Sequence, residues 1–312
     1  MSRAELIYPI RGRIERELAK LESDPFNKDV IIRYYKVRTT EVSPATVLTE
    51  LIWLHTLSKL LAKKFEEVTK QDIEDLIFKF DAKGNKDTTK NRTRRILKGF
   101  YQWLRGYPKG EYPPEVKWIR MKRLPLSPIT ADDLIPFEEV VRISEFALNL
   151  RDKFLVQGKV DAGCRIGEIL TMKIGEVQFN DAGAIGYSDG KTGYKPLIFT
   201  WSAKTLAQWL NIHPFRNDKN APVFCLLDRA KPMQMTYAAA YGAFKKCVRK
   251  ACVNKRVWFH LLKHVSCTED SRRGMPDSYR KFKHHWSPNS KMAGVYEHLS
   301  QTDIPTIQKD TW

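Results

Sequence analysis

The residues best suited to chemistry gather in the C-terminal part of the chain. His260, Lys263 and His264 are spaced three and four residues apart, so a helix would place all three side chains on one face. The stretch from Lys245 to Lys291 contains thirteen Lys and Arg residues but only three acids. Such an excess of positive charge is suited to phosphate groups. The sequence therefore indicates acid–base chemistry beside a phosphate, and Tyr296 follows His260 by 36 residues.

A second candidate site lies in the segment DAGCRIGEIL, residues 161–170. Gly163 is predicted to end one helix and Arg165 to begin the next, where free backbone N–H groups and the helix dipole favour an anion. Glu168 follows one helical turn after Arg165 and would orient its guanidinium through charge-assisted hydrogen bonds. An ordinary surface pair of Arg and Glu has the same spacing, so this segment alone leaves both interpretations open.

A third candidate lies in the turn SDGKTGYKP, residues 188–196, between two predicted strands. Its glycines permit a tight hairpin that projects Lys191. Lys195 is the alternative lysine, and a solvated turn lysine is the ordinary interpretation of either residue.

The sequence contains no recognisable metal or nucleotide motif. It has no His-Glu-x-x-His, no Asp-rich loop, no P-loop and no Gly-x-Gly-x-x-Gly. We therefore expect no cofactor, and cationic side chains would have to replace a metal ion in cleaving a phosphodiester. A tyrosine fits such a reaction when a basic surrounding and a proton acceptor promote loss of its proton, because its ordinary pKa is about 10.

Two boxes of residues resemble those of the tyrosine recombinases, the phage integrase family. In the first, the family pattern Gly-x-Arg-x-x-Glu-Leu is matched by Gly163, Arg165, Glu168 and Ile169. In the second, the pattern His-x-Leu-Arg-His, then Gly-His or Trp, then Tyr is matched by His260-Leu261-Leu262-Lys263-His264, His285-Trp286 and Tyr296. The run WSPNSKM…VYEHLS is most similar to integrases of archaeal viruses and plasmids.

The resemblance implies a reaction and a role for the matched residues. Tyr296 would attack the scissile phosphate, form a 3′-phosphotyrosyl link and release a 5′-hydroxyl. Arg165 and Lys263 would hold the non-bridging oxygens as charge develops on them. Lys191 would protonate the leaving oxygen, and His260 would exchange a proton with the tyrosine. Such an enzyme would cut and rejoin DNA without a cofactor.

The remaining positions of the second box are given supporting roles. Trp286 occupies the family's His or Trp position, and His285 beside it would serve as a substitute donor. His264 is expected to be a buried, hydrogen-bonded histidine rather than a catalyst. Lys263 departs from the family, which has arginine there. Because lysine offers a point charge instead of a planar bidentate fork, we expect DNA binding with slow turnover.

Hydrophobic periodicity predicts a mainly α protein with a small antiparallel β-sheet. Apolar stripes at helical spacing predict helices over residues 44–61, 70–80 and 88–105, and further helices near 137–148 and 151–161. Alternating apolar residues between 177 and 199 predict three short strands joined by Gly- and Asp-rich turns. Helices are expected again over 203–210 and 236–253, and a short one opening at Ser287-Pro288 would carry Tyr296.

By resemblance these elements form a two-domain DNA clamp. The expected parts are an N-terminal helical arm (1–42), a helical core-binding domain (43–105), a basic linker (106–128) and a catalytic domain (129–312). Residues 81–125 hold thirteen basic and four acidic residues, which favours phosphate contact. The candidate DNA-binding residues are Lys90, Arg92, Arg94, Arg95, Lys98, Lys122, Arg123, Lys245, Lys246, Arg249 and Lys250.

Composition supports a nucleic-acid partner. The 312 residues include 54 Lys and Arg against 36 Asp and Glu, a net charge of +18 that favours a polyanion. Five cysteines without a CxxC pair suit a reducing cytoplasm. We expect no membrane segment, because the sequence has no apolar run long enough to span a bilayer and no secretory signal.

We interpret the sequence as a site-specific DNA recombinase that integrates and excises a mobile element. Its expected partner is double-stranded DNA, on which it would act as a homodimer or homotetramer. Two alternatives stay open: a catalytically weak or inactive DNA-binding relic of the family, and a related tyrosine enzyme such as a type IB topoisomerase or telomere resolvase.

Overall fold

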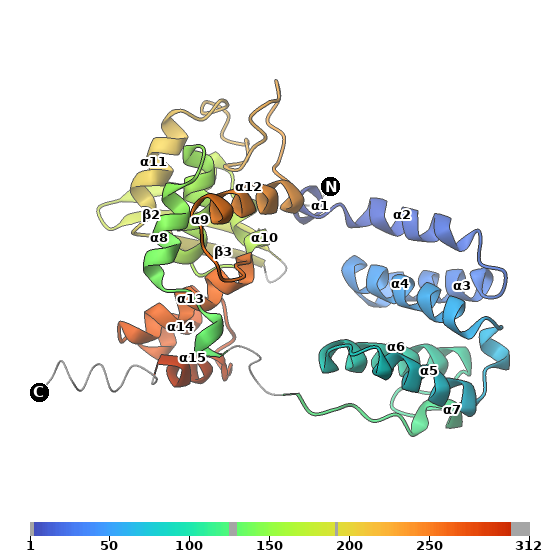
Figure 1. The fold of residues 1–312 in the computed structure, drawn as a ribbon. Coiled ribbons are helices and arrows are strands. Elements are labelled where there is room, and N and C mark those ends of the chain that lie inside the picture. The colour runs from blue at the N-terminus through green and yellow to red at the C-terminus, as the bar shows by residue number, and fades with distance from the viewer. Residues whose placement is uncertain (1–2, 125–129, 191–192, 301–312) are drawn as a thin grey trace, which may run out of the picture. The chain divides into compact units, whose positions relative to one another are not determined.

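The computed structural model describes residues 3–124, 130–190 and 193–300 of the chain. The chain divides into two compact units, Pro9–Pro125 and a second that combines Met1–Tyr8 with Leu126–Trp312. We call them the helical unit and the sheet unit, because the three strands of the described part all lie in the second (Figure 1). The predicted fold class, mainly α with a small antiparallel β-sheet, is confirmed.

The helical unit is built from amphipathic helices whose starts are fixed locally. Pro44 occupies the first position of α4 (Pro44–Leu61), and Thr69 forms a capping box with Asp72 at the start of α5 (Lys70–Ala82). Its elements are α2 (Ile10–Leu21), α3 (Lys28–Glu41), α4, η1 (Phe65–Glu67), α5, α6 (Asp87–Leu104) and α7 (Pro114–Lys117). Their apolar faces meet in a core that includes Phe65 and Phe100, whose ring centroids lie 4.9 Å apart.

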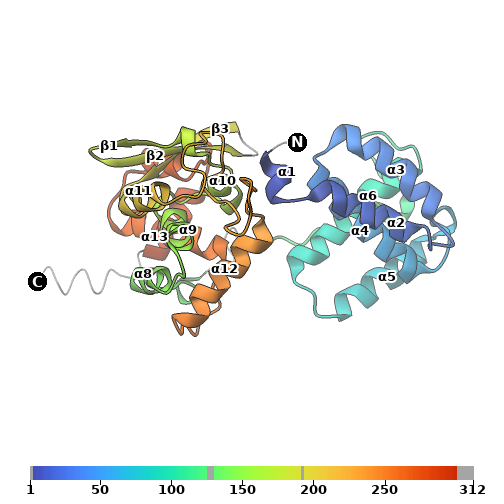
Figure 2. The ribbon, with the colours of Figure 1, turned by 90° about the horizontal axis from the view of Figure 1, so that it is seen from above.

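The sheet unit surrounds one buried helix. Figure 2 shows α9 (Leu150–Asp161) amid α8 (Phe137–Glu145), α11 (Ala203–Asn211), α12 (Tyr237–Lys250) and α13 (Phe259–Arg272), all of which contact it. Because α9 has neighbours on several sides, Phe154, Leu155 and Val156 are all fully buried. The remaining helices of the unit are α1 (Arg3–Ile7), η2 (Ala131–Asp133), α10 (Ile166–Leu170), η3 (Ile174–Glu176), α14 (Asp277–Lys283) and α15 (Met292–Ser300).

The sheet has the strand order β1-β2-β3 and is antiparallel throughout. Its strands are β1 (Gln178–Asn180), β2 (Gly183–Gly190) and β3 (Gly193–Phe199), which agrees with the three strands predicted from alternation. The β2–β3 register pairs Tyr187 with Pro196 and Gly190 with Gly193. Lys191, the preferred hairpin lysine, lies outside the described residues, whereas Lys195 lies on β3.

The expected N-terminal arm and linker are arranged differently in the structure. Residues 9–42 form α2 and α3 of the helical unit, while residues 1–8 belong to the sheet unit. Part of the expected linker also packs into the helical unit, since Val116 and Ile119 are buried in its core. The functions given to residues 43–105 and 106–128 stay predictions.

The prediction of a helix that begins at Ser287-Pro288 is wrong. Ser290 N–H donates to the carbonyl of Ser287 in a turn, and the helix that carries Tyr296 begins only at Met292. A helix not predicted, α14, comes before this turn, with Pro276 as its N-cap and Asp277 in its first turn. Among the described helices, none is long and apolar enough to cross a membrane.

Candidate active site

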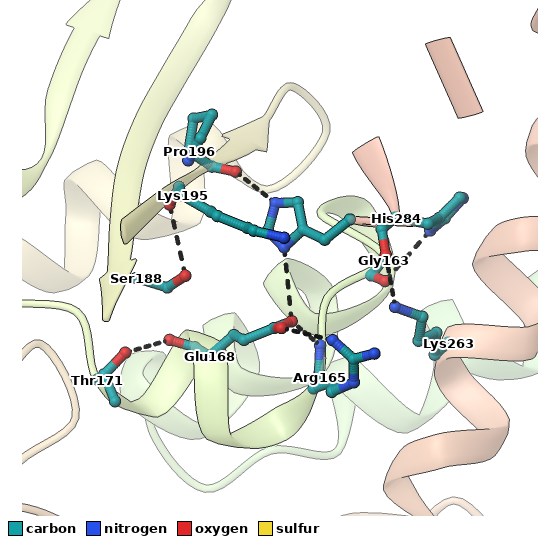
Figure 3. Close-up of polar contacts among 10 residues, drawn as sticks. Gly163, Arg165, Glu168, Thr171, Ser188, Lys195, Pro196, Lys263 and His284 are labelled. Atoms are coloured by element: carbon teal, nitrogen blue, oxygen red, sulfur yellow. Dashed lines mark hydrogen bonds and ion pairs between the residues drawn. The ribbon is translucent and has the colours of Figure 1, made fainter. Parts of the chain in front are cut away.

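Arg165 is held at the start of α10 by Glu168. Gly163, in the left-handed region with φ +56°, turns the chain out of α9, so that Arg165 becomes the N-cap of the next helix. Glu168 Oε2 accepts the backbone N–H of Arg165 at 2.5 Å, and Oε1 accepts Nη1 at 2.9 Å (Figure 3). The Arg165 side chain stays 50% exposed while that of Glu168 is 5% exposed. The carboxylate is thus buried behind a guanidinium that is open to a ligand.

The Glu168 carboxylate remains charged despite its burial. Burial raises its pKa, but the interactions with His285 and Arg165 together outweigh burial and lower the pKa to about 2. An ionised carboxylate is the stronger acceptor for a guanidinium. At neutral pH, Glu168 is therefore ionised and holds Arg165 through these two hydrogen bonds.

His285 connects three segments that are remote in sequence. Its Nε2 donates to the carbonyl of Pro196 on β3 at 2.9 Å, and its Nδ1 lies 3.7 Å from Glu168 Oε2. Its backbone has a positive φ of 55°, which costs free energy for a residue other than glycine. Lys195, the alternative hairpin lysine, precedes Pro196 and is half-buried. The expected supporting role of His285 thus has a geometric basis, through Glu168 and β3.

His260 and Lys263 differ in their access to solvent. His260 is exposed on the first turn of α13, whereas Lys263 is 4% exposed and its Nζ donates to the carbonyl of His284 at 3.0 Å. Although the His260 side chain reaches solvent, its ring is partly enclosed by neighbouring residues, and this burial lowers its pKa. The positive charges of Lys159, Lys263 and Arg165 lower the pKa further. A neutral imidazole is suited to accept a proton. Burial also lowers the pKa of Lys263.

The described neighbours of Tyr296 are apolar or neutral side chains, whereas a basic surrounding was expected for it. Its side chain is 2% exposed and packs with Cys267, Met292 and Trp286, whose ring is stacked on it at 5.5 Å. Its hydroxyl lies 2.5 Å from Nδ1 of His264. Burial, with the neighbouring Cys267 thiol, raises the pKa of the phenol. In this arrangement the hydroxyl is protonated and enclosed.

His264 is a buried histidine that is hydrogen-bonded to Tyr296. It is 9% exposed, and its ring meets that of His260 edge-on at 4.7 Å between centroids. Burial, then the nearby positive charges and His260, lower its pKa to about 4. His264 is therefore a neutral ring between His260 on one side and the hydroxyl of Tyr296 on the other.

His284 is a site residue that the sequence did not single out. It is fully buried, with Nε2 2.8 Å from Asp270 Oδ2 and Nδ1 3.2 Å from the carbonyl of Gly163. A Cβ at Gly163 would lie 2.2 Å from this ring, so only glycine fits. Lys283 Nζ donates to Asp270 Oδ1 at 2.8 Å. The signal in the sequence was Asp270, one of the few acids in a basic stretch.

Lys159 is a second site residue that the sequence patterns did not single out. It lies on α9, is 1% exposed, and its Nζ has no hydrogen-bond partner among the described residues. Burial, together with the charge of Lys263, lowers its pKa to about 8. An uncompensated buried amine costs free energy. A lysine among the apolar residues of a buried helix was the signal available in the sequence.

The candidate DNA-binding residues of α12 are all on the surface. The exposed residues of its last turns are Lys245, Lys246, Arg249 and Lys250, while Phe244 and Val248 face the core. This is the arrangement that the sequence predicted, and a row of cations on one helix face is suited to phosphate contact.

The candidates of the helical unit are less uniform. Arg92 and Arg95 are exposed and line a groove of about 910 Å³ with Trp103, Tyr107 and Lys109. Arg94 is 8% exposed and forms an ion pair with Asp81 at 2.5 Å, so its expected role on DNA does not fit its position. The remaining candidates of this unit are Lys90, Lys98, Lys122 and Arg123, of which Lys98 lies over the ring of Tyr112 and Lys122 pairs with Asp87.

The chain matches the model of the phage integrase family over residues 134–302. Among curated proteins, none matches the chain. In the described part of the chain, no group of three or more His, Cys, Asp or Glu residues is arranged to hold a metal ion.

Solved structures with a similar fold include three DNA complexes. A lambda integrase (75-356) dimer bound to a COC′ core site has 14% identity and a TM-score of 0.62, covering 85% of this chain and 92% of that one. XerH site-specific recombinase bound to palindromic difH substrate has 14% identity and a TM-score of 0.63, covering 98% and 96%. The Tn1549 transposon integrase (aa 82-397) with circular intermediate DNA has 16% identity and a TM-score of 0.57, covering 85% and 94%.

At these identities the structural likeness shows the fold. The family match covers more than half of the chain, and its range contains both boxes, from Arg165 to Tyr296. The chain therefore belongs to the phage integrase family, the tyrosine site-specific recombinases.

Proposed function

We propose that this protein cuts and rejoins DNA at specific sites through a 3′-phosphotyrosyl link to Tyr296, and so integrates and excises a mobile element. The observation that carries the proposal is the contact chain from Arg165 through Glu168 to His285 and Pro196. It joins the first box, the second box and the hairpin strand at one exposed guanidinium (Figure 3).

In this proposal the cations replace a metal ion. Arg165, whose side chain is half exposed, binds a non-bridging oxygen of the scissile phosphate and stabilises the charge that develops there. The ammonium of Lys263 contributes positive charge from its buried position behind the phosphate. His260, neutral and exposed, accepts the phenol proton as Tyr296 attacks phosphorus.

The leaving 5′-oxygen takes its proton from a lysine of the β2–β3 hairpin. We assign this role to Lys191, which the resemblance favours. Lys195 is the alternative, because it precedes Pro196, whose carbonyl accepts a hydrogen bond from His285. The bond that breaks is replaced by a phosphotyrosyl bond of similar energy, so a second DNA strand can reverse the step without a cofactor.

For the attack, Tyr296 has to leave its buried position. Its hydroxyl must separate from His264, and Trp286 must unstack from its ring. The ion pair between Arg280 and Glu297 also holds α15 on α14 and would have to give way. We infer that binding of DNA, or of a second copy of the chain on DNA, releases α15.

The alternative is a DNA-binding relic of the family. Two observations favour it: Tyr296 is 2% exposed, and the family's second arginine is Lys263. In this case the chain would keep its cationic surfaces but never form a covalent link. The experiment below separates the two functions.

Partner and assembly follow from the same proposal. The net charge of +18 and the exposed cations of α12 support double-stranded DNA as the partner, bound by a homodimer or homotetramer. The lambda integrase and XerH structures named above are DNA complexes, and one is a dimer. The resemblance of the run from Trp286 to Ser300 supports an origin in an archaeal virus or plasmid. The five cysteines without a CxxC pair support action in the cytoplasm.

The test is covalent capture on nicked DNA. Wild-type protein is incubated with a DNA site that carries a nick near the cleavage position, so that the released oligonucleotide diffuses away and the phosphotyrosyl link persists. We expect a covalent adduct at Tyr296 and none with Tyr296→Phe. Tyr279→Phe, at a tyrosine that is 67% exposed on α14, is the matched control and should keep the adduct.

The recognised DNA sequence must be found first, by screening intact fragments of the element that encodes the protein for binding. Binding without any adduct would establish the relic. Relaxation of supercoiled DNA that lacks a specific site would instead establish a topoisomerase.

A further inference from the structure

Residues 3–8 dock on the sheet unit, although the residues directly after them belong to the helical unit. Helix α1 contacts α10 and β2, and Ile7 is 1% exposed in the core of the sheet unit. Figures 1 and 2 both place α1 beside the elements of this unit. The docked segment reaches the helix that carries the first box.

Arg3 ties this segment to the end of α10. Its Nη1 and Nη2 donate to the two oxygens of Glu176 at 2.8 and 2.6 Å, and Nη1 also donates to the carbonyl of Thr171 at 3.3 Å. Thr171 is the C-cap of α10, and Glu176 ends η3. A bidentate pair of this kind fixes orientation as well as distance.

Tyr8 packs against the middle of α10. Its Cε2 lies 3.2 Å from the position that a Cβ of Gly167 would take, so the ring occupies the space beside this glycine. Gly167 stands between Arg165 and Glu168 in the first box. The Tyr8 ring is also stacked on Tyr237 of α12, with centroids 5.4 Å apart and an angle of 28°.

An aromatic ladder extends from Tyr8 to the start of α13. Tyr237 is stacked on Tyr241 at 5.9 Å, and Tyr241 meets Phe259 at 5.8 Å. Phe259 is the residue before His260. Tyr237 also meets Phe259 directly, with ring centroids 6.0 Å apart, so one segment touches the helix of Arg165 directly and the helix of His260 through the ring of Tyr237.

We propose that Arg3–Tyr8 is a positioning strap, which holds α10 in place and thereby fixes the direction of Arg165. Helix α10 has five residues, too few to be stable without outside contacts. The strap supplies contacts at its C-cap through Arg3 and at its middle through Tyr8. Its effect on DNA cleavage rests on the proposed function, whereas its effect on α10 does not.

The test is a charge swap with two readouts. Arg3→Glu and Glu176→Arg each break the bidentate pair, and the double variant restores it with the charges reversed. The first readout is amide hydrogen exchange of residues 164–171 in the free, full-length protein. The second is the single-turnover rate of covalent adduct formation on nicked DNA. Arg13→Glu, an exposed residue of α2, makes the same change of charge and serves as control.

We expect each single variant to exchange α10 amides about tenfold faster and to form adduct about tenfold more slowly, because a small misplacement of Arg165 is costly. The double variant should recover part of the loss seen in Glu176→Arg, but not all of it, because Glu176 also accepts the backbone N–H of Lys173 and the substituted arginine cannot. Arg13→Glu should leave the exchange rate unchanged. Tyr8→Ala should act like the single variants and Tyr8→Phe like wild type, which provides a second test if a charge variant fails to fold.

The hydrogen exchange result decides the proposal. Unchanged α10 exchange in the single variants, or a double variant no better than they are, overturns the strap. Altered exchange in a protein that forms no adduct supports the strap and refutes the proposed reaction instead. Mixing Arg3→Glu chains with Glu176→Arg chains should restore nothing. Restored exchange in the mixture would overturn the assignment to the same chain and show a strap exchanged between copies.

Discussion

The hydroxyl of Tyr296 lies 2.5 Å from Nδ1 of His264, and both side chains are buried. The neutral imidazole accepts this hydrogen bond while His260 meets its ring edge-on. The ring of His264 thus lies between Tyr296, the candidate nucleophile, and His260, the candidate proton acceptor. In the proposed reaction, α15, which carries Tyr296, would have to move before the hydroxyl could attack DNA.

Replacing His264 tests whether this bond restrains the nucleophile. His264→Phe keeps a ring of similar size but removes the acceptor, which leaves the buried hydroxyl with the weaker Cys267 thiol as partner at a cost of about 1–3 kcal/mol. We expect the stored position to weaken and adduct formation on nicked DNA to become several-fold faster. Rates would be measured under single-turnover conditions with saturating protein. A slower rate would mean that His264 assists the chemistry.

The same residue makes stability depend on pH. The pKa of His264 is lowered to about 4 in the folded protein, so between pH 6.5 and 4 the unfolded chain binds a proton that the folded chain does not. Its contribution to stability is complete at pH 7 and is lost as the pH falls, by up to about 3 kcal/mol. Urea unfolding at pH 7 and pH 5 should show a smaller loss in His264→Phe than in wild type. Equal losses would contradict the lowered pKa.

Lys159→Met should stabilise the protein. The ammonium is buried and has no hydrogen-bond partner in the part of the chain that the structure describes. Methionine fills a similar volume without that cost, which we expect to raise the free energy of unfolding by about 1–3 kcal/mol. The charge of Lys159 also lowers the pKa of His260, so this pKa should rise in the variant. Thermal unfolding and an NMR titration of the histidine C–H signals measure the two effects. A lower melting temperature would show that Lys159 has a structural partner.

Lys263→Arg restores the arginine of the family. We expect faster adduct formation, because a planar guanidinium can bind two phosphate oxygens where an ammonium binds as a point charge. The position is 4% exposed, so the larger side chain should also cost about 1–3 kcal/mol of stability. Lys263→Met, which lacks the charge, is the control and should form adduct more slowly than wild type. If Lys263→Arg is the slower of the two, the role assigned to this position is wrong.

Local patterns in the sequence determined the elements and the contacts within them. The apolar stripe of α6 and the capping box at Thr69 need only neighbouring residues, as does the pairing of Arg165 with Glu168 one turn apart. The three strands were predicted for the same reason, since alternation is a property of a single strand.

Burial by a second element was beyond the reach of these patterns. Arg94 resembled its basic neighbours, yet Asp81 from the preceding helix pairs with it. In α13, every residue from Leu261 to Thr268 is buried, so periodicity could not tell that His260 is open and Lys263 enclosed. Sequence spacing defines the faces of a helix but not which of them another element covers.

The sequence by itself determined the fold class, the two boxes of candidate residues and the family. Only the tertiary structure decided that Tyr296 is stored on His264, that His284 joins Gly163 to Asp270, and that Tyr8 supports the helix of Arg165. The physical reason is the distance along the chain between the partners. Their contacts form when the core is packed, and no local preference of either partner records them.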